Sequence, residues 1–486
     1  MVIMILIAVG CTKDLVVDSM TEPIEEKIEA IINDSQTNYL VTELQAIEIA
    51  NAFFDIQANT SGLRSSIAKT DSKSLVEVIK EERSNDPLMY VINYSEGGWA
   101  IVSATKSYYP VLAYSDENSF IQTSDIADMG PAGIWLSETK DAIKASETLD
   151  DSTRMVISSM WNNYTMEYEP DQIVSNLRSS NPMQDALSRR ISELVSRYGA
   201  GSSYRITTLA GARNLLSSIS EWQSLCNWAN SQGSPPEYTI FVGKNVYSTP
   251  TVGPLLPTRW HQGSPFNNLM PLSRDAGCAA IAVAQVMRYY QYPSSFYWNG
   301  STFNWSNIPV NPDSGSKQAA LIKLVGEDLN MNYTTFGSWA TPGNVESGIR
   351  SMGYTVTRAN HNYNLVRTQL LTYRKPVIML GGSLDAFDPI TYLGDSHYWV
   401  CDGAKEYDHN LVYFMDLINT SNNTYYNHPY VYSPSNPFST DITYVLNFHM
   451  NWGWGGKYDG WFLNHNANPG DHNYKYGRKD YYITRP

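Results

Sequence analysis

Several features that would assign the chain to common protein classes are missing from its sequence. No basic stripe suggests a surface for nucleic acid, and the formal net charge is −14. The eight histidines include no His-Glu-x-x-His motif and no pair at short metal-ligand spacing, so no zinc site is expected. The glycine-rich residues 453–456 lack the Gly-x-Gly-x-x-Gly pattern of a nucleotide-binding loop. We therefore expect neither a nucleic-acid partner nor a metal or cofactor.

A long apolar run is missing from the N-terminus as well. Residues 1–11 are apolar but far too few to cross a bilayer. Residues 1–10 resemble the end of a bacterial lipoprotein signal, in which small residues precede a cysteine that becomes the lipidated first residue, here Cys11. The segment lacks a positively charged start, and an apolar tip without this role is the alternative. With lipidation, residues 11–37 would serve as a polar tether to the membrane.

Cysteine is scarce, with four residues in the chain. Cys278 follows Gly277 and opens a run of small and apolar residues that predicts a helix. Unpaired backbone N–H groups at a helix start stabilise a thiolate, which is the nucleophilic form of cysteine. A buried structural cysteine is the alternative for such a position. Cys226 and Cys401 could pair, but two unrelated buried thiols are the expected case.

Three residues elsewhere in the chain match the needs of a cysteine nucleophile. His397 lies in residues 396–403, which predict a short buried strand ending at a glycine turn. Asn451 ends a second predicted strand, and a base needs a third group to set its ring orientation and tautomer. Gln262, sixteen residues before Cys278, offers an amide that could hold a developing oxyanion together with the Cys278 N–H.

These residues lie in four sequence blocks that together resemble the streptopain-type cysteine peptidases, a family of secreted bacterial enzymes with a papain-like fold. The blocks are Gln262-Gly263-x-Pro265-Phe266-Asn267, Gly277-Cys278-Ala279 with Gln285-Val286-Met287-Arg288-Tyr289-x-x-Tyr292-Pro293, the His397 strand with Asp402-Gly403, and Asn451-Trp452-Gly453-Trp454-Gly455-Gly456 with Asp459-Gly460. They span roughly the whole C-terminal half of the chain.

The resemblance implies an α+β, papain-like catalytic domain over residues 246–486, with a helical part and an antiparallel β part. The implied site has Cys278 as the nucleophile, His397 as the base, Gln262 in the oxyanion hole, Asn451 as the residue that orients His397, and Trp452 as the indole that shields the pair from water. The implied substrates are proteins or peptides, which are cleaved through a thioester on the cysteine without a cofactor.

Two departures from the family concern the surroundings of the histidine. Ser396 and Tyr398 flank His397, where the family has a glycine before and a small residue after, so we expect a narrower or differently shaped cleft. The gap from His397 to Asn451 is 54 residues, much longer than in streptopain. The added residues 406–443 are rich in Asn, Tyr, Ser and Pro, and predict an extended surface excursion that could modulate access to the site.

The N-terminal half predicts a smaller α+β unit. Residues 42–56 predict an amphipathic helix with a capping box at its start. The expected buried positions of this helix are Leu44, Ile47, Ala50 and Phe54. Residues 88–94 and 99–103 predict a hairpin, and residues 111–115 predict a further strand.

This order of elements resembles the inhibitory prosegment of streptopain-type zymogens, here over residues 38–135. Residues 136–245 predict a polar, helical region that either connects the prosegment to the catalytic domain or covers that domain. The acidic excess lies in this half of the chain, because residues 246–486 carry 16 basic and 16 acidic residues. We therefore expect the N-terminal half to cover the cleft until the chain is cut, and the candidate junction is Lys244 and Asn245, where an apolar strand gives way to a loop.

Two other functions fit the same sequence. Thirty-four tyrosines and thirteen tryptophans suit a carbohydrate-binding surface lipoprotein that retains a peptidase fold. The thiol and imidazole also suit an amidase or a transglutaminase, since all of these transfer an acyl group from an amide and only the acceptor differs. We expect an exported protein that is lipid-anchored at the bacterial cell envelope or surface, and that is released if processing removes the anchor.

Overall fold

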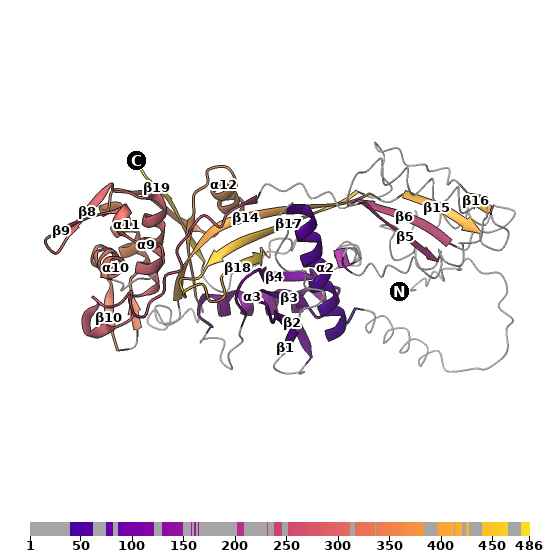
Figure 1. The fold of residues 1–486 in the computed structure, drawn as a ribbon, viewed down its shortest axis with the longest axis horizontal. Helices are drawn as coiled ribbons and strands as arrows, with labels where there is room; N and C mark the ends of the chain where they lie inside the picture. Colours follow the sequence, from indigo (N-terminus) through magenta and orange to yellow (C-terminus); the bar gives the residue numbers. More distant parts are fainter. Residues whose placement is uncertain are drawn as a thin grey trace, which may run out of the picture.

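The computed structural model in Figure 1 shows a structure of helices and antiparallel sheets. It describes residues 39–61, 74–80, 86–120, 129–148, 202–208, 238–244, 251–311, 316–335, 337–382, 396–412, 414–419, 424–426, 440–464 and 478–486, with the isolated positions 157, 160, 161, 164 and 231. Within these residues, no helix combines the length and the apolar character that a membrane span needs.

One eleven-stranded antiparallel sheet joins the N-terminal and C-terminal parts of the chain. Its strands in spatial order are β1 (Ser74–Lys80), β2 (Pro87–Tyr94), β3 (Trp99–Ser103), β4 (Val111–Ser115), β18 (Gly460–Leu463), β17 (Thr440–Asn451), β14 (Ser396–Val412), β13 (Val377–Gly382), β19 (Lys479–Thr484) and β12 (Thr355–Asn360), with β7 (Thr251–Val252) paired to β14. The two parts meet where Tyr114 of β4 pairs with Trp461 of β18. Because this pairing crosses the boundary, β1 to β4 extend the sheet of the C-terminal part.

The helix α2 (Glu43–Ser61) packs on the N-terminal strands and begins as predicted. The Thr42 N–H donates to Gln45 Oε1 (3.0 Å) and the Gln45 N–H donates to Thr42 Oγ1 (3.3 Å), which confirms the capping box. Leu44 is 73% exposed, so the prediction that it is buried is wrong. The buried face is instead Ala46, Ile49, Ala50, Phe53 and Phe54. These positions share one side of a helix, and Leu44 lies outside that side.

The predicted hairpin is present as β2 and β3, followed by β4. Its turn uses Gly97 and Gly98 at φ of 90° and 87°, a conformation that favours glycine. The next helix, α3 (Pro131–Ser146), packs against β13 and β14. The end of the N-terminal part therefore lies on the strand that carries His397.

A helical layer covers one face of the C-terminal strands. It consists of α9 (Cys278–Tyr290), α10 (Ser316–Asp328) and α11 (Pro342–Ser351), with the hairpins β8 (Ser295–Trp298) to β9 (Ser301–Asn304) and β10 (Asn332–Thr334) to β11 (Gly337–Trp339), and the short helices η4 (Pro271–Ser273) and η5 (Trp305–Asn307). The apolar side chains of α9 form one core with Tyr398 and Val400 of β14. The helix α12 (Tyr363–Leu371) also packs on β14, but Val366 and Leu370 of this helix belong to a different core, with Trp399.

β14 is longer than the strand predicted for residues 396–403. It continues through Gly403 to Val412 and pairs with β17, with a register shift between Cys401 and Gly403 in place of the predicted turn. A Cβ at Gly403 would lie 2.8 Å from His449 Cβ and 2.9 Å from the Val252 carbonyl oxygen. Glycine is needed here because two neighbouring strands approach the backbone closely, and not because the chain turns.

A second sheet is built from two segments that are far apart in the sequence. Its order is β16 (Thr424–Tyr426), β15 (Phe414–Asn419), β6 (Tyr238–Lys244) and β5 (Ser202–Thr208). β15 and β16 belong to the predicted excursion, and Figure 1 shows this sheet at the end of the β14 and β17 ribbon. β5 and β6 lie within residues 136–245, for which the sequence predicts helix, and the described part of that region also contains the end of α3.

The boundary between the two parts of the main sheet can be tested at Gly460. A Cβ there would lie 2.7 Å from the Tyr114 carbonyl oxygen and 2.9 Å from Trp99 Cζ2. Gly460→Ala should overpack this junction and lower the free energy of unfolding by about 1–3 kcal/mol in denaturant titrations. Gly343→Ala is the matched control, because Gly343 has open space around its Cα. Equal losses in both variants would contradict the close contact.

Candidate active site

Cys278 is the first residue of α9, as predicted. Gly277 precedes it at φ 86°, a backbone conformation that favours glycine, so the sharp entry to the helix requires glycine. The backbone N–H groups of Cys278, Ala279 and Tyr398 interact with the Cys278 sulfur. Three donors from two elements therefore surround one partly exposed thiol.

The ionisation of Cys278 differs from the expectation. Burial raises the pKa of the thiol above its ordinary value, and the backbone N–H groups lower it by less than burial raises it. In this conformation the sulfur is a protonated thiol at neutral pH. The helix start alone does not produce a thiolate, because the same packing that directs the N–H groups at the sulfur also removes it from water.

His397 lies on β14 opposite Gly381 of β13. Side chains alternate along a strand, and Tyr398 belongs to the core with α9 whereas Trp399 belongs to the core on the other face. A Cβ at Gly381 would lie 2.9 Å from Trp399 Cη2, so this position pair faces the Trp399 side. The register therefore places the Cβ of His397 on the Trp399 side of β14, one residue before the Tyr398 N–H that reaches the Cys278 sulfur.

Gln262 is held close to the start of α9 by its main chain. Its carbonyl oxygen accepts from the Ala276 N–H at 2.9 Å, two residues before Cys278. The Gln262 side chain is partly exposed. The carbonyl oxygen of Trp260, two residues before Gln262, accepts from the Gly455 N–H at 3.3 Å. This bond joins the glycine-rich turn to the segment that leads to Gln262.

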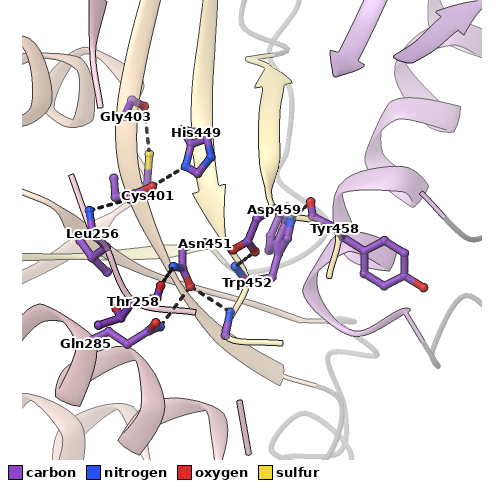
Figure 2. Close-up of polar contacts among 12 residues, drawn as sticks. Leu256, Thr258, Gln285, Cys401, Gly403, His449, Asn451, Trp452, Tyr458 and Asp459 are labelled. Atoms are coloured by element: carbon purple, nitrogen blue, oxygen red, sulfur yellow. Dashed lines mark hydrogen bonds and ion pairs between the residues drawn. The ribbon is translucent and has the colours of Figure 1, made fainter. Parts of the chain in front are cut away.

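Asn451 makes a different set of bonds from the one expected. Figure 2 shows its amide between α9 and the segment before Gln262. Its Oδ1 accepts from Gln285 Nε2 (3.0 Å) and from the Gly453 N–H (3.2 Å), and its Nδ2 donates to the Thr258 carbonyl oxygen (2.8 Å). Both lone pairs of the oxygen are therefore used, and in this structure none of these bonds goes to the histidine.

Trp452 is fully buried on the His397 face of the sheet. Its ring lies 5.4 Å from that of Trp399 and 5.1 Å from that of Phe462, and its Nε1 donates to the Tyr458 carbonyl oxygen at 2.9 Å. Its backbone N–H donates to Asp459 Oδ1 at 2.9 Å, as Figure 2 shows. Burial raises the pKa of Asp459 to about 7. The indole fills the core beneath the histidine strand.

A buried ion pair near the site was not expected from the sequence. His449 Nδ1 lies 2.6 Å from Asp402 Oδ1, and the Leu256 N–H donates to Asp402 Oδ2 at 3.0 Å. Burial opposes protonation of the ring, but the Asp402 carboxylate raises the pKa of His449 above its ordinary value. The pair joins β14, β17 and the chain that leads to Trp260. The Asp402-Gly403 block was the available signal, but its partner could not be chosen among eight histidines.

The helix α3 contacts the same face of the sheet as His397. Trp135 packs 4.8 Å from the Phe462 ring and donates to the Leu463 carbonyl oxygen at 3.4 Å. Glu138 forms an ion pair with Arg478, whose guanidinium lies 5.9 Å from the Trp399 ring. The N-terminal part therefore covers the core that Trp399 and Trp452 share.

The remaining candidate residues are distributed as follows. Cys11, Cys226 and Asn245 lie outside the described residues, and Lys244 is the last residue of β6. Cys401 is a buried free thiol in the core behind His397. Among the described residues, no group of three or more His, Cys, Asp or Glu side chains is arranged to hold a metal ion.

Comparison with known families accounts for both parts of the main sheet. Residues 260–462 match the Peptidase C10 family. Residues 38–143 match the Spi protease inhibitor family. The streptopain-type resemblance and the α+β fold with a prosegment are thereby confirmed, and the inhibitor-like part extends through most of α3.

Two curated relatives and two solved structures are similar to the chain. The thiol protease/hemagglutinin PrtT of Porphyromonas gingivalis is 26% identical over 247 residues, which cover 44% of this chain and 24% of that protein. Streptopain of Streptococcus pyogenes is 23% identical over 282 residues, which cover 48% and 60%. The chain thus matches only part of the length of either relative.

The solved structures come from Prevotella intermedia. A prointerpain A fragment is 16% identical, with 84% of this chain and 98% of that chain covered and a TM-score of 0.44. Active interpain A is 21% identical, with 48% and 95% covered and a TM-score of 0.31.

The protonated state of Cys278 predicts its reactivity in the full-length chain. Because burial raises its pKa, alkylation by iodoacetamide should be slow at neutral pH and should still accelerate above about pH 8.5, the ordinary pKa of a thiol. Peptide mapping by mass spectrometry separates Cys278 from Cys401, a fully buried internal control that should react more slowly. A rate that reaches its plateau below pH 8 would contradict this assignment.

Proposed function

We propose that the protein is a cysteine endopeptidase made as an inhibited precursor. The observation that carries the proposal is the Peptidase C10 match of residues 260–462 together with the position of Cys278, at the start of α9 with three backbone N–H groups around its sulfur. The Spi inhibitor match of residues 38–143 supports the precursor. Proteins or peptides are the proposed substrates.

The proposed reaction uses four groups. The Cys278 thiolate attacks a peptide carbonyl carbon, while Gln262 and the Cys278 N–H hold the oxyanion. His397 receives the thiol proton and gives it to the leaving amine, which forms a thioester on Cys278. His397 then activates water, which attacks the thioester and regenerates the thiol. This sequence of steps requires the His397 ring beside the Cys278 sulfur.

The N-terminal part is the proposed inhibitor. It joins the catalytic sheet through β4 and β18, and α3 packs on the face that holds His397. Gly130 lies so close to the Trp454 ring that a Cβ there would collide with it. While these contacts persist, the histidine strand is covered on the side to which it directs its ring. Cleavage of the chain, with Lys244 and Asn245 as the candidate junction, is the proposed start of activation.

The location of the protein is a separate proposal that rests on its sequence. Residues 1–10 resemble a lipoprotein signal, and Cys11 would receive the lipid. We propose export and a lipid anchor at the bacterial cell envelope, with residues 11–37 as the tether. Metabolic labelling with a fatty acid should mark the wild-type protein, and Cys11→Ser should remove the label.

Substitutions at the site test the peptidase reaction. Cys278→Ala should abolish casein hydrolysis, and Gln262→Ala should lower kcat by roughly 10²-fold or more, because one oxyanion donor is lost. Asn451→Ala should cost less than His397→Ala, since Asn451 exchanges no proton. Labelling of Cys278 by a peptide epoxide is measured beside hydrolysis. Labelling without hydrolysis would favour an acyl transferase. The absence of both labelling and hydrolysis would favour a binding protein.

The docking of α3 predicts the rate of activation. Trp135 is 2% exposed, so Trp135→Ala should remove about 3 kcal/mol or more of packing against the catalytic sheet and accelerate conversion to the mature enzyme. Conversion is followed on gels, and the final activity of the mature enzyme should equal that of the wild type. Leu75→Ala is the control, because Leu75 on β1 is 65% exposed. Conversion at the wild-type rate in both variants would argue against α3 as part of the inhibitor.

A further inference from the structure

Gln285 is a fully buried polar residue on α9, two helical turns after Cys278. Its Oε1 accepts from the Trp260 N–H at 3.2 Å, and its Nε2 donates to Asn451 Oδ1 at 3.0 Å. Figure 2 shows the two side-chain amides facing each other. A buried amide with both ends bonded to different segments restrains the distance between those segments.

The bonds leave only one orientation for each amide. A backbone N–H can only donate, so the group of Gln285 that faces Trp260 is Oε1. A backbone carbonyl can only accept, so the group of Asn451 that faces Thr258 is Nδ2. Gln285 Nε2 then faces Asn451 Oδ1, a donor against an acceptor. A flip of the Gln285 amide would oppose like groups at two contacts, and a flip of the Asn451 amide at three.

This pair of amides joins three segments that the proposed reaction uses. The helix α9 carries Cys278, the segment 258–262 leads to Gln262, and the end of β17 leads into the glycine-rich turn. Cys278 and Gln262 have to direct their donors at one oxyanion, so the position of segment 258–262 against α9 sets the geometry of that hole. The bonds of Gln285 and Asn451 set this position at Trp260 and Thr258.

We propose that Gln285 is a positioning residue for the oxyanion hole, acting through the Trp260 backbone and through Asn451. In this arrangement Asn451 works with Gln285, and its oxygen is not the hydrogen-bond partner of His397. The inference rests on the proposed peptidase function. It adds Gln285 to the residues on which the rate depends, although this side chain touches neither substrate nor nucleophile.

Gln285→Met tests the proposal, because methionine has a similar volume and removes both hydrogen bonds. Activity is measured on matured enzyme and normalised to the Cys278 thiol titrated with a peptide epoxide. We expect kcat to fall about 10- to 100-fold with KM changed less than about 3-fold, since the transition state loses more than the bound substrate. Gln285→Glu keeps the volume and the acceptor for Trp260, so its kcat should lie between those of the wild type and Gln285→Met. A Gln285→Met enzyme within 2-fold of the wild type would overturn the proposal.

A double-mutant cycle with Asn451→Ala separates positioning from packing and from an effect on His397. If the two amides act as one unit, the double variant should lose no more kcat/KM than the worse single variant. The limb of the pH profile that reports the imidazole should stay in place in all three variants. Additive losses, or a shift of that limb in Asn451→Ala alone, would show that Asn451 serves the histidine and would overturn the shared role.

Hydrogen exchange keeps this test independent of the peptidase reaction. In the full-length chain, Gln285→Met should accelerate exchange of the Trp260 amide, which loses its acceptor, while the Leu329 amide, which bonds Val325 at the end of α10, should keep its wild-type rate as the control. Unchanged exchange at Trp260 would overturn the inference. Faster exchange in a chain whose wild-type form hydrolyses no substrate would instead refute the proposed function and leave the restraint established.

Discussion

The alternation of side chains along β14 is the constraint on which the rest of the structure depends. Because neighbouring residues of a strand face opposite ways, Tyr398 packs with α9 while His397 and Trp399 lie on the other side. The backbone of one strand therefore supplies an N–H to the Cys278 sulfur and, one residue earlier, carries an imidazole to the opposite face. The Cys278 thiol is only partly exposed, and the packing around it raises its pKa, so the sulfur is protonated in this conformation.

The N-terminal part covers the side of β14 that carries Trp399. Glu138 of α3 is partly buried, and this burial raises the pKa of its carboxyl even though Arg478 opposes the rise. An ion pair of this kind adds little stability of its own but is costly to break from one side only. Aromatic packing supplies the larger contribution, through Trp135 on Phe462 and through the continuous core that includes Trp399 and Trp452. The same core residues therefore pack against both the His397 strand and α3.

The features that could be predicted from the sequence are local ones. The start of α9 at Cys278, the capping box at Thr42 and the hairpin of β2 and β3 depend on neighbours within a few residues, and the structure contains all three. The family resemblance located the catalytic and inhibitory parts for the same reason, because its motifs are short and contiguous. Helix faces were less certain, as the exposure of Leu44 shows.

The features that could not be predicted depend on pairing between distant segments. Gly403 was expected to end a strand, but a glycine also allows close approach, and only the presence of His449 and Val252 decides between the two. The Asn451 amide could bond a histidine ring or the amide of Gln285, and sequence spacing cannot decide which of the two is its partner. The pairing of β6 with β15 joins residues that are more than 170 positions apart, and no local pattern announces it.

The pairing of β6 with β15 would separate cleavage of the chain from release of the catalytic part. β6 hydrogen-bonds to β5 on one edge and to β15 on the other, and Lys244 is its last residue. Scission after Lys244 would cut the backbone. The upstream fragment would still be hydrogen-bonded through β6 to β15 of the downstream fragment. A fragment held in this way remains at a high effective concentration near its old neighbours. Peptide-bond scission would then produce a nicked two-chain complex, and the liberated catalytic unit would appear only after β6 peels away from β15.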